Sequence, residues 1–276
     1  MPLTRVRIKR LAEGENAESW RAALEDPAWL TASHVLKEEN GSWVRRATLR
    51  DREIVVKCRS LNTLSRRLKT RFGLGHGDKQ WHGAEILQRI GVRTARPLAI
   101  ASARTDDRMC EVLVLEYLRG KSLLEVLNEV SHSIGPTVRQ QHAITKSVIE
   151  TTLAMLQTGV WNRDHKPSNL IVLEGDQSAP KIAIIDCVGI REGGVYGLEN
   201  EPQASLACLV IEAIGCNCPP RRALWLIALK ALISSNQTVA NRSQERKLLA
   251  AWIHAIDSEV QAHGDPRPKV NPLTPR

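Results

Sequence analysis

Apolar and polar residues alternate in the first third of the chain, in short runs typical of β-strands. Residues 34–58 contain three such runs, and Asn40-Gly41 separates the first two. An Asn-Gly pair between β-prone runs is a strong hairpin signal, because both residues tolerate the backbone angles of a two-residue turn. Two further runs, at 96–103 and 110–118, flank a polar turn and predict another pair of strands.

Helical spacing of apolar residues appears before and after the first three runs. Residues 17–30 predict a short helix that is interrupted near Pro27, and residues 80–90 fit a helix that ends at Gly91. Residues 59–79 lie between the third strand and this helix. They form a basic connector whose glycines predict a flexible stretch.

Beyond Gly120 the pattern becomes mainly helical. The predicted elements follow in the order 121–130 (helix), 138–160 (helix), 170–173 and 181–187 (short apolar runs around a polar turn) and 203–262 (helices). We therefore expect a strand-rich first third and a helix-rich remainder, which join near residues 115–120.

The chain carries 39 basic and 30 acidic residues, a formal net charge of +9. A positive field attracts anionic partners such as a nucleotide, a nucleic acid or an acidic membrane face. No interleaving of aromatic and basic residues marks a base-stacking platform, so a nucleic-acid partner is not expected. Cys216 and Cys218 have the wrong spacing for a zinc knuckle, and scattered thiols are typical of a reduced, cytoplasmic protein.

No segment of the sequence predicts a membrane span. The N-terminal stretch has basic residues without a following apolar run, so we expect no secretory signal. The longest apolar stretch, 223–233, contains Lys230 and is too short to cross a bilayer. We expect a cytoplasmic protein, with peripheral contact at the anionic inner face of the cell membrane as one hypothesis and a solvated loop as the other. The residues that would make this contact are Arg59, Arg66, Arg67, Lys69, Arg71 and Lys79.

Six polar residues could together supply the groups that phosphoryl transfer requires. This chemistry needs a cation for the nucleotide phosphates, an acid that orients it, metal ligands, and a carboxylate beside the attacking hydroxyl. Lys57 ends the run "EIVVK" and could bind the phosphates, while Glu85 in the next predicted helix could pair with it. Taken alone, each of the two would be interpreted as a solvated surface residue.

The other four residues follow in the second half of the chain. Asp164 in "RDHKPSN" is the candidate base, and Lys166 could neutralise charge on the transferred phosphoryl group. Asn169 and Asp186 could hold a divalent cation, because carboxylate and amide oxygens are suitable ligands for Mg²⁺. A strand-end Asp is often only a turn former, so the interpretation of Asp186 depends on the order of all six residues, which matches a known motif set.

With these residues the chain resembles the protein-kinase-like superfamily. "WNRDHKPSNLIV" looks like its catalytic loop, "IIDCVG" stands where its Asp-Phe-Gly metal motif would be, and "VVK" resembles its third-strand lysine. The resemblance implies an α+β, bilobal fold, with a small antiparallel-sheet lobe that carries one helix (33–118) and a larger, mainly helical lobe (119–262). Residues 1–32 would be a helical extension, and the Pro-rich residues 263–276 a disordered tail.

A narrower likeness is to the bacterial lipopolysaccharide kinases that phosphorylate Kdo or heptose in the inner core. It rests on the basic connector, on "LVLEYLRG" and "IIDCVGIR", and on "SLACLVIEAI" near the last helices. The sequence also departs from the superfamily pattern. Gly41 stands in place of a glycine-rich loop, Asn162 replaces the usual His before Arg-Asp, His165 replaces the following Leu, and "DCVG" contains one extra residue.

The resemblance implies a kinase that uses ATP and Mg²⁺ and acts on a sugar hydroxyl of the lipopolysaccharide inner core or a similar lipid-linked glycan. Residues 187–203 lack Ala-Pro-Glu and any Ser or Thr, which favours a small or lipid-linked acceptor over an extended peptide. A protein Ser/Thr kinase or small-molecule kinase is the alternative. A nucleotide-binding pseudokinase scaffold is an alternative of another class: the absent glycine-rich loop favours it, and Asp164 with Asp186 opposes it.

Overall fold

The computed structural model describes residues 2–39, 41–106, 108–193, 201–234, 241–262 and 272–273, without the side chains of residues 201–205. The chain divides into two compact units. Unit 1 comprises Met1–Glu85 and Ala95–Leu118, and unit 2 comprises Ile86–Thr94 and Arg119–Arg276. In the described part of the chain, no helix combines the length and the apolar character that a membrane crossing requires.

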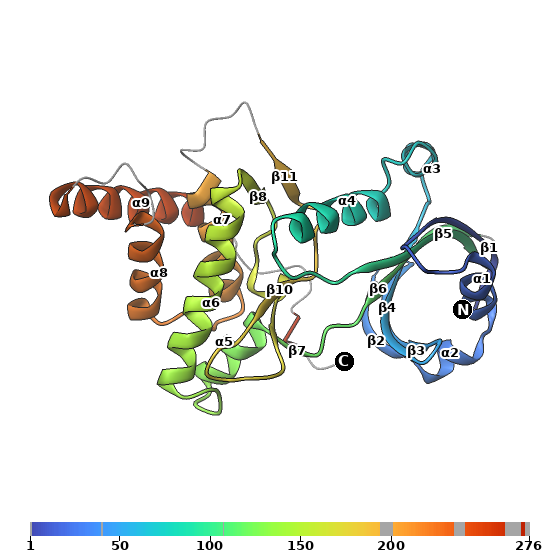
Figure 1. The fold of residues 1–276 in the computed structure, drawn as a ribbon, viewed down its shortest axis with the longest axis horizontal. Helices are drawn as coiled ribbons and strands as arrows, with labels where there is room; N and C mark the ends of the chain where they lie inside the picture. The colour runs from blue at the N-terminus through green and yellow to red at the C-terminus, as the bar shows by residue number, and fades with distance from the viewer. Residues whose placement is uncertain are drawn as a thin grey trace. The chain divides into compact units, whose positions relative to one another are not determined.

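Unit 1 is built on a six-stranded antiparallel sheet with the strand order β1-β5-β6-β4-β3-β2 (Figure 1). The strands are β1 (Leu3–Leu11), β2 (His34–Glu39), β3 (Ser42–Leu49), β4 (Arg52–Ser60), β5 (Pro97–Thr105) and β6 (Arg108–Glu116). The strands predicted within 34–58 and 96–118 are therefore confirmed. Asn40 lies outside the described residues, and its neighbour Gly41 has a φ of +74°, as a tight hairpin turn requires.

The structure differs from the prediction of a helical extension over residues 1–32, because this segment begins with a strand. Strand β1 pairs with β5 and forms an edge of the sheet. A register shift between Thr4 and Arg7, with Arg5 at a φ of +51°, interrupts the alternation of β1. This bulge hides the two-residue period from sequence inspection. The helices predicted after it are present, as α1 (Ala17–Glu25) and α2 (Ala28–Ala32).

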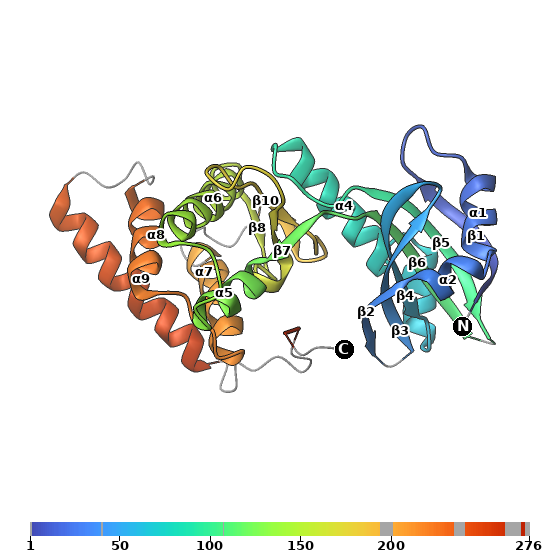
Figure 2. The ribbon, with the colours of Figure 1, turned by 90° about the horizontal axis from the view of Figure 1, so that it is seen from below.

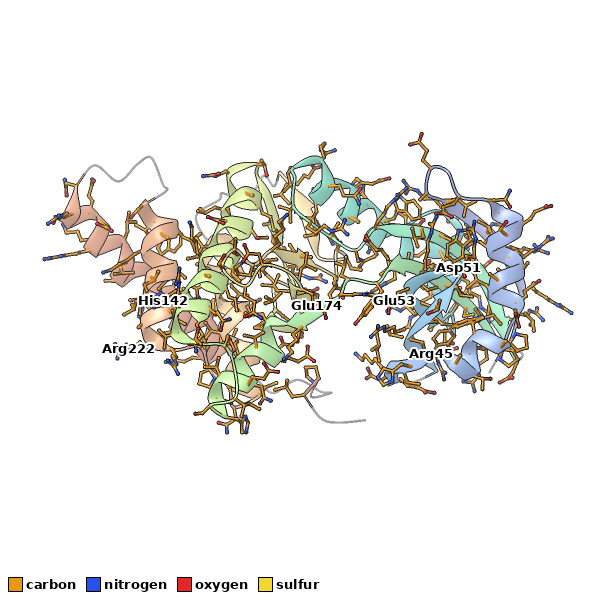
Figure 3. All side chains as sticks on the ribbon, turned by 60° about the horizontal axis from the view of Figure 1, so that its bottom comes forward. Arg45, Asp51, Glu53, His142, Glu174 and Arg222 are labelled. Carbon is orange, nitrogen blue, oxygen red and sulfur yellow. The ribbon has the colours of Figure 1, made fainter. Side chains whose placement is uncertain are left out.

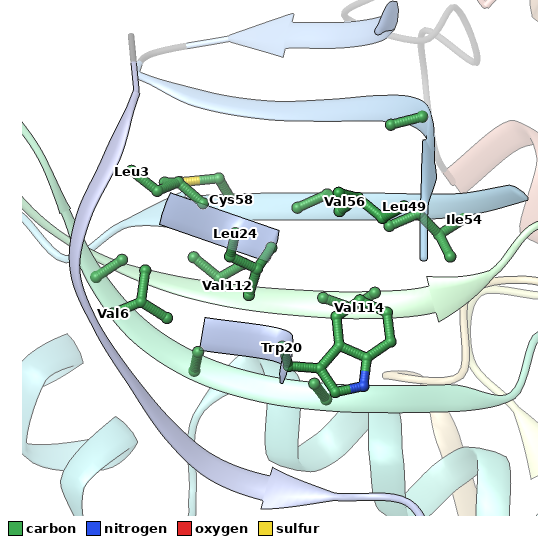
Figure 4. Close-up of a cluster of buried hydrophobic side chains, with 14 of the residues drawn as sticks. Leu3, Val6, Trp20, Leu24, Leu49, Ile54, Val56, Cys58, Val112 and Val114 are labelled. Carbon is green, nitrogen blue, oxygen red and sulfur yellow. The ribbon is translucent and has the colours of Figure 1, made fainter. Parts of the chain in front are cut away.

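One face of the sheet packs against α1 and α2 (Figure 4). Trp20 and Leu24 of α1 are completely buried in this cluster, and each such side chain contributes about 1.5–3 kcal/mol of transfer free energy. Arg45 of β3, labelled in Figure 3, donates hydrogen bonds to Leu30 O (3.3 Å) and Ser33 Oγ (3.1 Å) and so ties α2 to the sheet.

The alternation of β4 assigns its side chains to two faces. Ile54, Val56 and Cys58 are buried in the cluster beneath α1 and α2. Because neighbouring side chains of a strand point to opposite faces, Lys57 and Arg59 project from the other face of the sheet. The local sequence thus places the candidate phosphate-binding lysine away from the apolar core.

The basic connector 59–79 is partly helical, which the sequence analysis did not predict. It contains α3 (Leu64–Arg71), and Thr63 caps this helix by accepting a hydrogen bond from Arg66 N at 3.3 Å. Next comes α4 (His76–Arg89), which matches the helix predicted over 80–90 with an earlier start.

Gly75 and Gly77 lie against Glu111, a residue of β6 that is only 3% exposed. Gly77 N donates a hydrogen bond to Glu111 Oε2 at 2.9 Å. A Cβ atom at Gly77 would lie 3.3 Å from the carboxyl carbon of Glu111, and one at Gly75 would collide with Glu111 Oε1. These glycines therefore permit a close approach to a buried carboxylate.

Unit 2 is mainly helical (Figure 2). Its helices are α5 (Leu123–Ser131), α6 (Val138–Gln157), α7 (Glu201–Gly215), α8 (Arg222–Ser234) and α9 (Arg242–Ala262). The first two begin where the sequence supplies capping boxes, since Ser122 with Glu125 and Thr137 with Gln140 exchange side-chain and backbone hydrogen bonds.

Two small antiparallel sheets accompany these helices. Their strands are β7 (Gly120–Ser122), β8 (Val160–Asn162), β9 (Leu170–Leu173), β10 (Ile182–Ile184) and β11 (Ile190–Glu192), in the orders β10-β9-β7 and β11-β8. The two apolar runs at 170–173 and 181–187 are thus confirmed as a strand pair. The other three strands have three residues each, which is too short for a periodic signal.

The C-terminal stretch 263–276, predicted to be a disordered tail, lies outside the described residues except for Pro272 and Leu273. Leu273 is partly buried and packs against Leu124, Ala213 and Cys218 of unit 2. At this position the stretch contributes to the core of the unit.

Candidate active site

The loop after β8 is held in shape by its own polar groups. Asn162 Oδ1 accepts a hydrogen bond from Asp164 N at 3.0 Å. Asp164 O accepts two more, from Lys166 N at 2.8 Å and from Asn169 Nδ2 at 2.9 Å. A short 3₁₀ helix, η1 (Pro167–Asn169), completes the loop before β9 begins. The predicted base, phosphate cation and amide ligand therefore share one internally bonded loop.

The carboxylate of Asp164 is partly open to solvent and lies beside two cations. Its Oδ1 is 3.8 Å from Lys166 Nζ, and its Oδ2 is 3.3 Å from Arg163 Nη2. Its side chain is 32% exposed, so an acceptor hydroxyl could reach it. Lys166 is more exposed, at 45%, and could contact an anionic group that approaches the same carboxylate.

Asn169 and Asp186 lie at the same end of the β9–β10 pair. Leu170 and Ile184 are register partners, and Ile185 N donates a hydrogen bond to Asn169 O at 3.0 Å. Because Asn169 Nδ2 is committed to Asp164 O, its Oδ1 is the atom that can act as a ligand. Asp186 Oδ1 accepts a hydrogen bond from Val188 N at 3.3 Å and fixes the turn that follows. An amide oxygen and a carboxylate at this position fit the donor preference of Mg²⁺.

Gly189, the glycine of "DCVG", touches the loop of Asp164. Its carbonyl accepts a hydrogen bond from Arg163 N at 3.2 Å. A Cβ atom at this position would lie 2.7 Å from Asn162 Oδ1 and 3.0 Å from Asp164 N. The two segments can lie this close only because residue 189 has no side chain. The motif "DCVG" has one extra residue, and its glycine, Gly189, still contacts the Asp164 loop.

The sequence interpretation missed Glu212, which binds the loop from a helix outside it. Ser168 lies between Lys166 and Asn169, and it donates to Glu212 of α7 from its N (2.8 Å) and from its Oγ (2.7 Å). Glu212 is 8% exposed. Its position in an apolar helix was a signal of a buried carboxylate, but nothing in the sequence identified its partner 44 residues away.

His165, between Asp164 and Lys166, turns away from solvent. It is 1% exposed, and its Nε2 lies 3.1 Å from Thr152 Oγ1 of α6. Burial disfavours the imidazolium and lowers the pKa of His165 to about 4, so the ring is neutral near pH ~7. It therefore packs the loop against α6 and adds no charge to the site.

Lys57 lines a cavity of about 390 Å³ in unit 1. The other charged residues of this lining are Lys37, Arg59 and Arg66, with Glu39 as a carboxylate. Lys37 Nζ is 3.4 Å from Glu39 Oε2, which leaves the cationic groups in excess. Such a lining suits polyanionic phosphates.

Glu85 does not form the predicted pair with Lys57 and has other partners. Its Oε1 accepts hydrogen bonds from Arg10 Nη2 at 2.6 Å and from Trp81 Nε1 at 2.8 Å. Arg10 also lies over the Trp81 ring, 4.5 Å from its centroid. Within the described residues, no ion pair joins Lys57 and Glu85. Glu85 instead ties α4 to β1, the strand that the sequence did not reveal.

Known proteins resemble this chain at the level of structure. No family model and no curated protein sequence matches it. The solved structure described as "WaaP in complex with acyl carrier protein" matches it with a TM-score of 0.61 and 20% sequence identity, over 92% of this chain and 99% of that chain. At this identity the likeness concerns the fold alone. The chain therefore has the fold of WaaP.

Proposed function

We propose that this protein is an ATP-dependent kinase that transfers the γ-phosphoryl group to a sugar hydroxyl of the lipopolysaccharide inner core, Kdo or heptose, or of a similar lipid-linked glycan. The observation that carries the proposal is the internally bonded loop of Asp164, Lys166 and Asn169, next to Asp186, in a chain with this fold.

Each residue of the loop has a defined task in this reaction. The Asp164 carboxylate accepts the proton of the attacking sugar hydroxyl, and its contact with solvent allows the acceptor to approach. Lys166 neutralises charge on the transferred phosphoryl group. Lys57 and the cationic cavity around it bind nucleotide phosphates.

Asn169 Oδ1 and the Asp186 carboxylate would hold Mg²⁺. When bound, this ion supplies neutralisation of the phosphate oxygens. The chain itself contributes the orientation of the two ligands, through the bonds from Asn169 Nδ2 to Asp164 O and from Val188 N to Asp186 Oδ1.

A glycan acceptor is favoured over a peptide by the length of the segment between Asp186 and α7. Protein kinases use a long segment at this place to dock an extended peptide, and residues 187–203 contain neither its Ala-Pro-Glu motif nor a Ser or Thr for regulatory phosphorylation.

The test is phosphate transfer from radiolabelled ATP to a lipopolysaccharide core extract, with wild type, Asp164→Asn and Asp186→Asn. Removal of the base or a metal ligand is expected to lower kcat by roughly 10²–10⁴. The control is Asp257→Asn on the exposed side of α9, which should retain wild-type activity. Wild-type rates in both Asp164→Asn and Asp186→Asn would overturn the assignment of the site.

The choice of acceptor needs a second comparison. Transfer of the label to glycan, and not to protein or peptide substrates, would support the proposed class of acceptor. Transfer to protein with none to glycan would assign the chain to the protein kinases. Nucleotide binding without transfer to any acceptor would identify a pseudokinase scaffold.

A further inference from the structure

Helix α3 presents an unusual group of exposed apolar side chains. Leu64 is 72% exposed, Phe72 70% and Leu74 59%, and Leu68 is 44% exposed. Leu64, Leu68 and Phe72 are spaced by four residues, so they line one edge of the helix. The helix and the turn after it therefore display a continuous apolar edge.

The opposite side of α3 is attached to unit 1. Thr70 is 5% exposed, and its carbonyl accepts a hydrogen bond from Lys9 Nζ at 3.4 Å. Arg67 Nε donates to Leu61 O at 3.0 Å, and Thr63 caps the first turn. Since these contacts hold the helix by its other side, the apolar edge is fixed in an outward orientation.

Basic residues flank this edge on both sides. On a helical projection, Arg67 and Arg71 fall on one side of the edge and Lys69 on the other. All three are exposed. The sequence contains no Asp or Glu between Glu53 and Asp78, so no carboxylate in this stretch offsets their charge.

The combination of Leu and Phe side chains with flanking Arg and Lys residues matches an interfacial membrane helix. Long basic side chains can extend to the headgroups while neighbouring apolar side chains enter the acyl boundary. An anionic lipid surface complements the charge of this helix along its whole length, which a neutral surface does not.

We propose that α3 and the turn to Leu74 form a membrane-docking element for anionic bilayers. Leu64, Leu68, Phe72 and Leu74 insert into the interface, and Arg67, Lys69 and Arg71 contact lipid phosphates. This docking uses other residues than the proposed phosphotransfer, because Arg66 is the residue of α3 that lines the Lys57 cavity and it is not among the docking residues.

The test is co-sedimentation of the full chain with vesicles of phosphatidylethanolamine that contain phosphatidylglycerol, against vesicles of phosphatidylcholine alone. The Leu64→Gln/Phe72→Gln variant removes apolar surface and keeps the charge and the helix-forming character. It should lower the partition coefficient roughly ten- to hundred-fold. Ile134→Gln, at a residue 77% exposed in unit 2, is the matched control and should bind as wild type does.

A second variant separates charge from apolar insertion. Lys69→Gln/Arg71→Gln should weaken binding to the anionic vesicles by about five-fold per residue and have no effect with phosphatidylcholine. Asp186→Ala should bind vesicles as wild type does, which distinguishes docking from catalysis. The proposal is overturned if wild type binds neither vesicle, or if Leu64→Gln/Phe72→Gln binds as tightly as wild type. Equal melting temperatures of the variants would show that each is folded.

Discussion

The Ser168–Glu212 contact offers the sharpest quantitative test of how the candidate catalytic loop is held in place. Ser168 donates two hydrogen bonds to one carboxylate that is 8% exposed. A hydrogen bond to a charged group contributes about 1.5–3 kcal/mol. Ser168→Ala removes the Oγ bond and should cost about that much. Glu212→Ala removes both bonds and should cost roughly 3–6 kcal/mol.

A double-mutant cycle of these two variants tests the contact, with the free energy of unfolding measured in urea for each protein. Because each single variant loses the Oγ bond, and the double variant loses it only once, the coupling free energy should be about 1.5–3 kcal/mol. Ser178→Ala is the matched control. Ser178 also donates both N and Oγ to a carboxylate, that of Asp176, but on the exposed β9–β10 turn. Ser178→Ala should therefore cause no comparable loss in the free energy of unfolding.

Activity gives an independent measure of the same contact. Since Ser168 lies between Lys166 and Asn169, release of the loop should lower kcat more than it changes the KM for ATP. Glu212→Gln should recover much of the loss, because an amide can accept from Ser168 N and donate to Ser168 Oγ. A coupling free energy near zero would refute the reasoning, as would wild-type kcat in Glu212→Ala.

Three further predictions follow from the same geometry. The pKa of His165 is about 4 in the folded chain and about 6.5 in the unfolded chain. The unfolded chain therefore binds the proton first, and stability falls by roughly 3 kcal/mol as pH drops from 6.5 to 4. His165→Leu should remove this fall in urea titrations, and an unchanged pH profile would contradict it. Gly189→Ala should lower stability by about 1–3 kcal/mol through collision with the Asp164 loop, and kcat should drop with it; a wild-type rate would contradict the close approach. Gly75→Ala should cost a similar amount by pressing on Glu111 but leave kcat unchanged, as unfolding and transfer assays on one sample would show.

The conformation of the loop that carries Asp164, Lys166 and Asn169 could be predicted from the sequence because its geometry is local. Asp164, Lys166 and Asn169 lie within six consecutive residues, and the bonds that shape the loop join residues at most five apart. Local spacing therefore determines which side chains converge. The strand pair around the turn at 174–180 was predictable for the same reason, since both runs are apolar and the turn between them is short.

Contacts between distant segments could not be predicted in this way. The partner of Glu85 depends on the rotation of α4 and on β1, whose bulge at Arg5 obscures its period. Glu212 finds Ser168 only through tertiary packing. Helix α3 escaped prediction because eight residues with so many cations lack a clear apolar face toward a core.

The two substitutions that separate this loop from the superfamily pattern carry a common physical cost. Asn162 and His165 flank Asp164, and each has a buried nitrogen, Nδ2 and Nδ1 respectively, without a hydrogen-bond partner in the described part of the chain. An unsatisfied buried donor or acceptor costs about 1–3 kcal/mol. The other polar atom of each residue has a partner in the loop or in α6, namely Asp164 N for Asn162 and Thr152 for His165. The chain therefore gives up stability at the place where it orients the candidate base, which is the pattern expected of a functional site. On this reasoning His165→Leu should raise the free energy of unfolding even near pH ~7, where the ring is already neutral, and its effect on kcat would measure how far the orientation of Asp164 depends on the histidine.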